Sequence, residues 1–250
     1  MKKVLLLHKQ LGETPLEALT YFQEHHREYV DETLCYAGRL DPQAEGLLLV
    51  LVGDECQKRE EYQNLEKQYE FSVLFGIETD TYDVMGMVTH VDARPKTVDE
   101  QAILDRFAGV FEQETPPYSS ATVEGKPLYW WARQGRLAEI ALPKKQIVIN
   151  ELEIYNARQV QLRDLVPEII RRVQLVNGDF RQEEIVRRWH EIESQYGDAS
   201  FPLLQFRIRC SSGTYVRALA HEMGKPYGGA LAYSIKRTAV GRYILSDDET

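Results

Sequence analysis

The stretch Y-A-G-R-L-D-P-Q-A-E-G-L-L-L-V-L (Tyr36–Leu51) contains the two features from which the fold can be worked out. Its last part, the apolar run Leu47–Val52, is too short for a helix and is bounded by glycines, which predicts a central strand. Just before that run, Gly38 permits unusual backbone angles and Pro42 favours an extended conformation at Asp41. The stretch therefore predicts a turn that presents one carboxylate from a rigid sheet edge, although simple turn chemistry explains the same residues.

Four further segments have the pattern of strands. Val4–Leu7 is short and apolar, whereas Gln68–Phe75, Ile147–Ile154 and Leu204–Cys210 alternate apolar with polar residues. We expect Leu204, Phe206, Ile208 and Cys210 to point inward.

Two helical regions are expected. Thr14 and Pro15 are typical of an N-cap and first helical position, and Leu16, Leu19 and Phe22 follow on one side. Between two of the strands, apolar residues at helical spacing predict a helical hairpin over Arg163–Ser194 that turns at Asn177-Gly178.

These elements alternate irregularly, without the βαβ order of a nucleotide-binding sheet. We therefore predict an α+β fold with an extended mixed, largely antiparallel sheet flanked by helices. Residues 1–250 are expected to form a single domain, with the hairpin as a helical insertion at about 160–198.

The composition of the chain limits the classes of function that it can have. The chain has 250 residues and a formal net charge of −9, which argues against a protein that coats nucleic acid nonspecifically. The segment Leu203–Arg242 nevertheless contains seven bases and one acid, which permits an anionic partner. The three cysteines are far apart and no zinc motif is present, so we expect no metal. Without a signal or membrane-spanning segment, a cytoplasmic location and no membrane contact are expected.

The segment C-S-S-G-T-Y-V-R-A-L-A-H-E-M-G (Cys210–Gly224) predicts a strand, a turn and a helix capped by Thr214 and ended by Gly224. Arg217 would be the third residue of this helix, where a cation opposes the helix dipole. A nearby anion explains this position; an Arg extending into solvent or binding a phosphate are the alternatives.

The segment T-P-P-Y-S-S-A-T-V-E-G-K-P-L-Y-W-W-A-R-Q-G (Thr115–Gly135) contains three consecutive aromatic residues, Tyr129 to Trp131. On a helix they point about 100° apart, so they cannot all face the same core. Together with Lys126 and Arg133 they suit base stacking and phosphate contact, although a small core between segments is an alternative.

Taken in order, these segments resemble the TruB type of pseudouridine synthase, a family that isomerises the T-loop uridine of tRNA (tRNA position 55). The resemblance extends over about Val4 to Tyr243, interrupted by the hairpin. The matching motifs are Gly38-x-Leu40-Asp41-Pro42-x-Ala44-x-Gly46, Lys67-x-Tyr69, Thr79-Asp80-Thr81-x-Asp83-x-x-Gly86, Tyr118-Ser119, Gly125-Lys126-x-Leu128-Tyr129, Ala132-Arg133-Gln134-Gly135 and Gly213-Thr214-Tyr215-Val216-Arg217.

The resemblance implies a pseudouridine synthase fold and assigns roles to residues. Asp41 corresponds to the family's catalytic Asp, Arg217 to the Arg that pairs with it, and Tyr69 to the aromatic that stacks on the flipped uracil. The residues that we assign to substrate binding are Tyr36, Gly38, Arg39, Lys67, Tyr118, Lys126, Tyr215 and Ile235.

The implied reaction detaches uracil from C1′ of its ribose, turns it and rejoins it through C5, which requires no metal and no cofactor. Asp41 either adds covalently to the sugar or removes a proton from C2′, and the sequence leaves both routes open. Either role needs an ionised carboxylate, which a partnered Arg217 favours electrostatically. RNA, most directly tRNA, is the expected partner of a monomer.

The sequence departs from the family pattern in several places. Tyr36 and Ala37 replace the motif's His and Thr, and Gly38-Arg39-Leu40-Asp41 echoes the RluA and RsuA types, which modify other RNAs. The hairpin is an addition that either helps to grip RNA or binds a protein; the alternative is that its paired arginines, Arg171-Arg172 and Arg187-Arg188, simply face solvent. The chain ends soon after the last expected strand, so no C-terminal PUA domain is expected.

Two other functions compete with the synthase. The first is a non-catalytic RNA-binding or RNA-folding protein on the same scaffold. The second is a glycoside hydrolase that uses Asp41 together with Asp80 or Asp83.

Overall fold

The computed structural model describes residues 2–245, so the expected end of the domain at residues 246–250 lies outside the described part. Its centre is a nine-stranded sheet in the order β1-β3-β12-β4-β11-β10-β7, with β2 beside β3 and β13 beside β12. Every pair in this sheet is antiparallel except β3 with β12. The prediction of an α+β fold with a mixed, largely antiparallel sheet is confirmed.

The strands of this sheet are β1 (Val4–Lys9), β2 (Leu34–Tyr36), β3 (Ala44–Val52), β4 (Lys67–Phe75), β7 (Gly109–Glu114), β10 (Lys144–Gln161), β11 (Ser200–Cys210), β12 (Ala230–Val240) and β13 (Tyr243–Ile244). Two small sheets pair β5 (Ile77–Thr79) with β6 (Val88–Val91) and β8 (Thr122–Val123) with β9 (Lys126–Pro127). The helices are α1 (Pro15–His25), α2 (Arg59–Gln63), α3 (Glu100–Phe107), α4 (Leu128–Arg133), α5 (Leu162–Gln174), α6 (Gln182–Tyr196) and α7 (Val216–Gly224). Short 3₁₀ turns cover Arg27–Tyr29, Gly53–Lys58, Leu137–Glu139 and Lys225–Tyr227.

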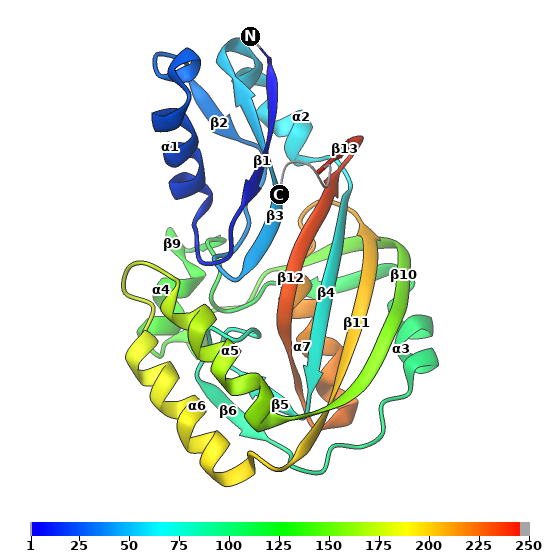
Figure 1. Cartoon of the computed structure of the whole chain (residues 1–250). Coiled ribbons are helices and arrows are strands. Elements are labelled where there is room, and N and C mark those ends of the chain that lie inside the picture. The colour runs from blue at the N-terminus through cyan, green and yellow to red at the C-terminus, as the bar shows by residue number, and fades with distance from the viewer. Residues whose placement is uncertain (1, 246–250) are drawn as a thin grey trace.

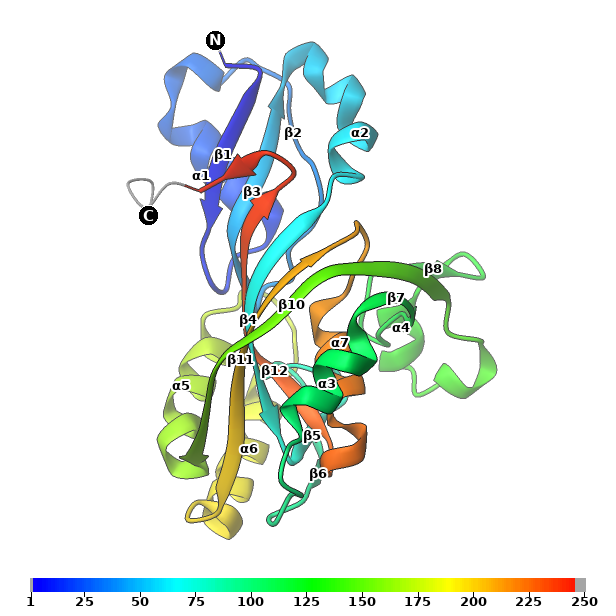
Figure 2. The ribbon, with the colours of Figure 1, turned by 90° about the vertical axis from the view of Figure 1, so that its right-hand side faces the viewer.

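Helices cover both faces of the sheet, with α3 and α7 on one side and α5 and α6 on the other (Figure 2). A hydrophobic core lies on each face of the sheet. Because side chains alternate along a strand, β4 contributes residues to both cores. Phe71, Val73 and Phe75 belong to the cluster that includes α3 and α7, whereas Leu74 belongs to the cluster with α5 and α6. The predicted inward residues of β11, from Leu204 to Cys210, are all buried.

The predicted hairpin is confirmed as α5 and α6, which are joined by a turn that contains Asn177 and Gly178. Gly178 has φ +90°, a conformation that glycine adopts without strain. Apolar residues on the inner faces of the two helices, among them Ile169 and Trp189, are fully buried against the sheet.

One end of the molecule is formed by β1, β2 and β3 with α1, and the longer strands form the other end (Figure 1). The two ends are joined where β3 pairs with β12 over only three residue pairs, from Ala44 with Ile235 to Gly46 with Arg237. Gly46 has φ +103°, and a Cβ there would lie 2.3 Å from the carbonyl oxygen of Arg237. Only glycine therefore permits this close junction, which lies directly after Asp41.

Helix α1 begins as predicted, with reciprocal hydrogen bonds between Thr14 and Glu17. The predicted apolar side was partly wrong: Leu16 is 62% exposed, whereas Ala18 and Leu19 are buried. The reason is that α1 packs on β1 and β2 through its second turn, so Leu16 in the first turn lies beyond that core.

Helix α7 ends at Gly224 as predicted but begins later than predicted. Its N-cap is Tyr215 rather than Thr214, so Arg217 is its second residue. The hydroxyl of Thr214 instead donates to the carbonyl of Ser211, and the side chain of Gln113 on β7 bonds both backbone groups of Tyr215. Gly224 itself has the right-handed φ of −74°, and the chain continues into the 3₁₀ turn Lys225–Tyr227 before it reverses at Gly228, with φ +81°.

Within residues 2–245, no helix has the length and apolarity that crossing a membrane requires.

Candidate active site

The turn between β2 and β3 presents Asp41 as predicted. Gly38 within this turn has φ +89°, and the backbone N–H of Ala44 donates to the carbonyl of Asp41 over 2.9 Å, which closes the turn. The N–H of Gly12 donates to the carbonyl of Pro42 and ties the turn to the loop after β1. The side chain of Asp41 is 42% exposed, so a rigid backbone presents an accessible carboxylate.

Arg217 lies in the first turn of α7, and its side chain is only 4% exposed. Its Nε donates to Oδ2 of Asp41 over 2.7 Å, Nη1 donates to the carbonyl of Thr81 over 2.9 Å, and Nη2 donates to the carbonyl of Tyr118 over 2.8 Å. Each guanidinium nitrogen thus has a separate acceptor, which fixes the plane of the group. Among the described residues, Oδ1 of Asp41 has no hydrogen-bond partner and is available to a ligand.

A second carboxylate, Asp83, lies behind this pair and is 6% exposed. Its Oδ1 accepts from the hydroxyl of Thr81 over 2.6 Å and from the N–H of Met85 over 2.9 Å. Burial raises the pKa of Asp83 to about 6, although the positive charge of Arg217 acts in the opposite direction. Asp83 therefore shapes the segment whose Thr81 carbonyl orients Arg217.

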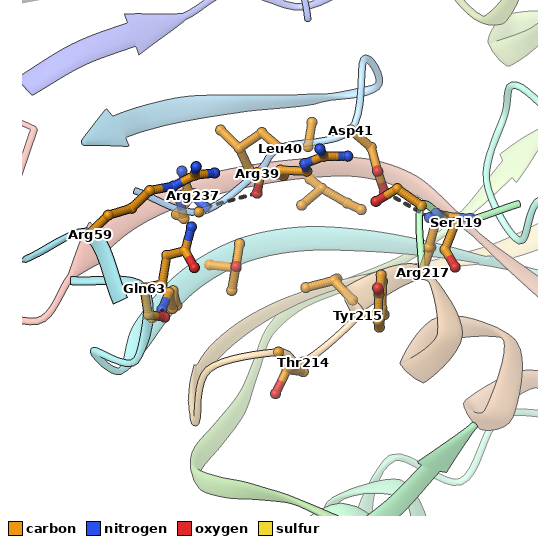
Figure 3. Close-up of a pocket in the computed structure, with 18 residues that line it drawn as sticks. Arg39, Leu40, Asp41, Arg59, Gln63, Ser119, Thr214, Tyr215, Arg217 and Arg237 are labelled. Carbon is orange, nitrogen blue, oxygen red and sulfur yellow. Dashed lines mark hydrogen bonds and ion pairs between the residues drawn. The ribbon is translucent and has the colours of Figure 1, made fainter. Parts of the chain in front are cut away.

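Asp41 and Arg217 open onto a cavity of about 460 Å³ (Figure 3). Its volume is within the ~300–1,000 Å³ that is usual for small-molecule sites. Tyr69 of β4 and Ile235 of β12 also line it. Burial raises the pKa of the Tyr69 hydroxyl, so this aromatic is a neutral wall of the cavity.

Of the predicted substrate-binding residues, Gly38, Arg39, Lys67, Tyr215 and Ile235 line the same cavity as Asp41, Tyr69 and Arg217. We name it the Asp41 cavity. Lys67 is buried, and its ammonium donates to the carbonyls of Gln63 and Leu65. Burial lowers the pKa of Lys67 to about 8.

The structure places the other three predicted residues elsewhere. Tyr36 and Tyr118 line a second cavity of about 540 Å³ on the other side of Asp41. Lys126 lines neither cavity; its ammonium lies 5.5 Å from the ring centre of Trp130. The three consecutive aromatics do diverge, because Trp131 is buried, Trp130 is half-buried and Tyr129 is 47% exposed.

Sequence reasoning missed Arg237, which is 1% exposed and lines the Asp41 cavity. Its Nε donates to the carbonyl of Leu47 over 2.7 Å and its Nη1 to the carbonyl of Arg39 over 3.1 Å. These two carbonyls lie on opposite sides of Asp41 in the sequence, so Arg237 holds both ends of the turn. Figure 3 shows the bond from Arg237 to Arg39. Gln63 and Arg59 also line the cavity and were missed, because they belong to no motif. Ser119 and Thr214 line it too; they belong to the matching motifs but were assigned no role.

A hydrolase would pair Asp41 with Asp80 or Asp83; Asp83 lines the second cavity together with Asp41, whereas Asp80 lines neither cavity. Asp80 accepts from Arg181 and from the N–H of Met87, and neither Asp80 nor Asp83 lines the Asp41 cavity. No group of three or more His, Cys, Asp or Glu side chains comes together as a set of metal ligands within residues 2–245.

Known proteins resemble this chain over most of its length. Residues 26–168 match the family model of the TruB family pseudouridylate synthase, N-terminal domain. The chain is 30% identical over 250 residues to tRNA pseudouridine synthase B of Syntrophus aciditrophicus (strain SB), covering 98% of this chain and 64% of that protein. For the protein of the same name from Bacillus cereus (strain ATCC 10987 / NRS 248), the identity is 30% over 251 residues, covering 99% and 68%. The chain thus spans about two thirds of the length of these relatives.

Two solved structures share the fold. A Cbf5-Nop10-Gar1 complex contains a chain that superposes with a TM-score of 0.57 at 16% identity, covering 98% of this chain and 50% of that chain. An H/ACA RNP bound to a substrate RNA containing 2′-deoxyuridine gives a TM-score of 0.54 at 16% identity, covering 98% and 49%. At this identity the likeness shows the fold alone.

Proposed function

The chain belongs to the TruB family of pseudouridylate synthases, and we propose that it isomerises a uridine in RNA to pseudouridine. The observation that carries this proposal is the Asp41–Arg217 pair, with one carboxylate oxygen bound and the other free at a cavity that Tyr69 also lines. A binding protein would not need a carboxylate held in this way.

In the proposed reaction, the target nucleoside leaves its stack and enters the Asp41 cavity with its ribose near Asp41 and its uracil against Tyr69. Oδ1 of Asp41 then either bonds to C1′ or takes a proton from C2′, and both routes break the bond between N1 and C1′. After the uracil has turned, C5 bonds to C1′; in the first route the bond between Asp41 and C1′ breaks at this step, and in the second route Asp41 returns the proton to C2′. The hydrogen on C5 then leaves as a proton, and N1 gains one. The sequence is redox-neutral.

Tyr69 also offsets the cost of extruding the nucleoside. Removing a base from its stack costs a few kcal/mol, and stacking on an aromatic side chain returns ~1–3 kcal/mol. Tyr69 is 9% exposed and lies between β11 and β12 in the sheet, so the ring needs no ordering when the base arrives.

We propose the T-loop uridine of tRNA as the target, because the relatives are named tRNA pseudouridine synthase B. Another RNA remains the alternative, since Gly38-Arg39-Leu40-Asp41 echoes the RluA and RsuA types, which modify other RNAs. A monomeric state, a cytoplasmic location, the absence of a metal or cofactor and a single domain with residues 160–198 as an insertion stay predictions.

Release of tritium from uridine labelled at C5 tests this function. A T-loop stem-loop RNA with the label at the target uridine should lose tritium to water in step with pseudouridine formation. A non-catalytic RNA binder would retain the label, and a hydrolase would yield free base or sugar without exchange. Retention of all label in this RNA and in total cellular RNA would reject the proposal; exchange in cellular RNA alone would reject only the T-loop target.

A further inference from the structure

The second cavity, of about 540 Å³, meets the Asp41 cavity at the catalytic pair, since Asp41 and Arg217 line both. It lies between the Asp41 turn, α4 and the turn that joins α5 to α6. The α5–α6 turn contributes Asp179, Phe180 and Arg181. A nucleotide in the Asp41 cavity therefore has a second, hollow site directly beside it.

The lining of this second cavity combines aromatic rings with cations. Tyr129 is 47% exposed and Phe180 is 38% exposed, so neither ring is covered by the rest of the protein. Among the described residues, the guanidinium of Arg39 has no hydrogen-bond or ion-pair partner. Exposed aromatic rings stack on nucleobases, and an unpaired cation in the same cavity binds the phosphate of the stacked nucleotide.

The α5–α6 turn is fixed in position before any ligand arrives. Arg181 donates to both oxygens of Asp80, over 2.7 and 3.2 Å, and its guanidinium lies 4.6 Å from the ring centre of Tyr118. On the other side, Arg133 of α4 forms an ion pair of 3.3 Å with Asp179. Phe180 lies between these two anchored residues, so its ring is held at the cavity without the entropy cost of ordering a free loop.

The hairpin is also tied to the catalytic turn through Gln43. The Nε2 of Gln43 donates to the carbonyl of Arg172 in α5 over 3.0 Å, which fixes the orientation of the amide. The Oε1 of the same amide is buried and has no donor among the described residues. Gln43 also lines the second cavity, so the contact between the catalytic turn and the hairpin forms part of its wall.

We propose that the second cavity binds one base of the RNA next to the target uridine, stacked on Phe180 of the α5–α6 turn. This inference rests on the proposed function, because it requires RNA at Asp41. It gives the hairpin a role in holding the substrate: the base beside the target is kept unstacked, which keeps the target itself extruded.

Fluorescence of 2-aminopurine tests this stacking without any turnover. The probe is placed in a T-loop stem-loop RNA at the nucleotide on either side of the target, one position in each RNA. Wild-type protein should quench the probe at one of the two positions. Phe180→Ala should remove that quenching and weaken RNA binding about 5- to 150-fold, the range expected for one lost base stack. Phe180→Trp should retain both.

The matched control is Tyr155→Ala, because Tyr155 on β10 is 37% exposed and lines neither cavity. It should bind and quench as wild type does. An abasic nucleotide at the quenched position should make wild type and Phe180→Ala bind equally. Equal binding and quenching by Phe180→Ala on the intact RNA overturns the inference, as does a loss that persists with the abasic RNA. Quenching without pseudouridine formation would reject the proposed function alone.

Discussion

The Nε of Arg217 donates to Oδ2 of Asp41 over 2.7 Å and joins two residues that are 176 positions apart in the chain. The same guanidinium is bound by the carbonyls of Thr81 and Tyr118. Four separate segments therefore meet at one planar group, and the position of the Asp41 carboxylate depends on all of them.

Replacing Arg217 by lysine should separate charge from geometry. Lysine keeps the positive charge but lacks the planar fork, so it cannot bind Asp41 and both carbonyls together. We expect kcat to fall by about 100-fold or more while KM changes little. Arg217→Ala should in addition lower the free energy of unfolding by about 3–5 kcal/mol, because buried acceptors lose their donor. Single-turnover kinetics and urea unfolding measure the two effects; a lysine variant with wild-type kcat would contradict the role given to the fork.

Tyr69 is expected to act mainly through its ring. Tyr69→Phe keeps the stacking face, whereas Tyr69→Ala loses it and leaves a gap in the cavity wall. We therefore expect the Phe variant to retain more activity than the Ala variant in a pseudouridine assay at saturating RNA. Equal activity of the two variants would show that the ring does not hold the uracil.

The pKa of Asp83 predicts a dependence of stability on pH. Its folded-state pKa of about 6 lies above the ordinary value of 3.8, so the folded protein binds this proton more tightly than the unfolded chain does. Protonated Asp83 therefore stabilises the folded protein below pH 4, and this contribution to the free energy of unfolding is lost as the pH rises to 6. Asp83→Asn, whose amide oxygen accepts the same hydrogen bonds, carries no such dependence.

Urea unfolding at several pH values checks this prediction. Between pH 4 and pH 6 the wild type should lose about 2–3 kcal/mol relative to Asp83→Asn. A difference that stays constant over this range would mean that Asp83 is ionised throughout.

A side chain at Gly46 should destabilise the protein mainly by a steric clash, and this effect can be separated from backbone strain. Its Cβ would lie 2.3 Å from the carbonyl of Arg237, at a φ of +103°. Gly109 provides the control, because it has φ +83° but nothing within 4 Å of an added Cβ. Gly109→Ala should cost only the ~1–2 kcal/mol of left-handed strain. Gly46→Ala should cost more and also lower kcat, since the collision moves the Asp41 turn; comparable thermal unfolding and activity of the two variants would contradict this.

Much of the fold could be predicted because its signals are local. The apolar run in β3, the alternation in β4 and β11 and the spacing of the hairpin each follow from the period of one element. The residues of the candidate active site were harder to predict from the sequence. The position of Arg217 indicated only that an anion was near, and the identity of that anion came from the family resemblance. Its two carbonyl acceptors carry no sequence signal, because every residue has a carbonyl.

The burial of Arg237 could not be predicted from the alternation of apolar and polar residues in β12. Register shifts occur in the pairing of β12 with β4 between Ala232 and Ser234 and between Arg237 and Ala239. Such irregularities change which side chains point inward, so a basic residue that looks solvent-facing becomes fully buried. The cap of α7 was missed for a related reason, because Gln113 reaches it from a distant strand.

We propose that the carboxylate of Asp41 breaks the bond between N1 and C1′, and replacing Asp41 by asparagine is the sharpest test of this role. The amide keeps the shape of the side chain but can neither attack C1′ nor take a proton from C2′. With T-loop RNA labelled with tritium at C5 of the target uridine, we predict that the variant binds the RNA as wild type does and releases no tritium. Release at the wild-type rate by Asp41→Asn would contradict the account.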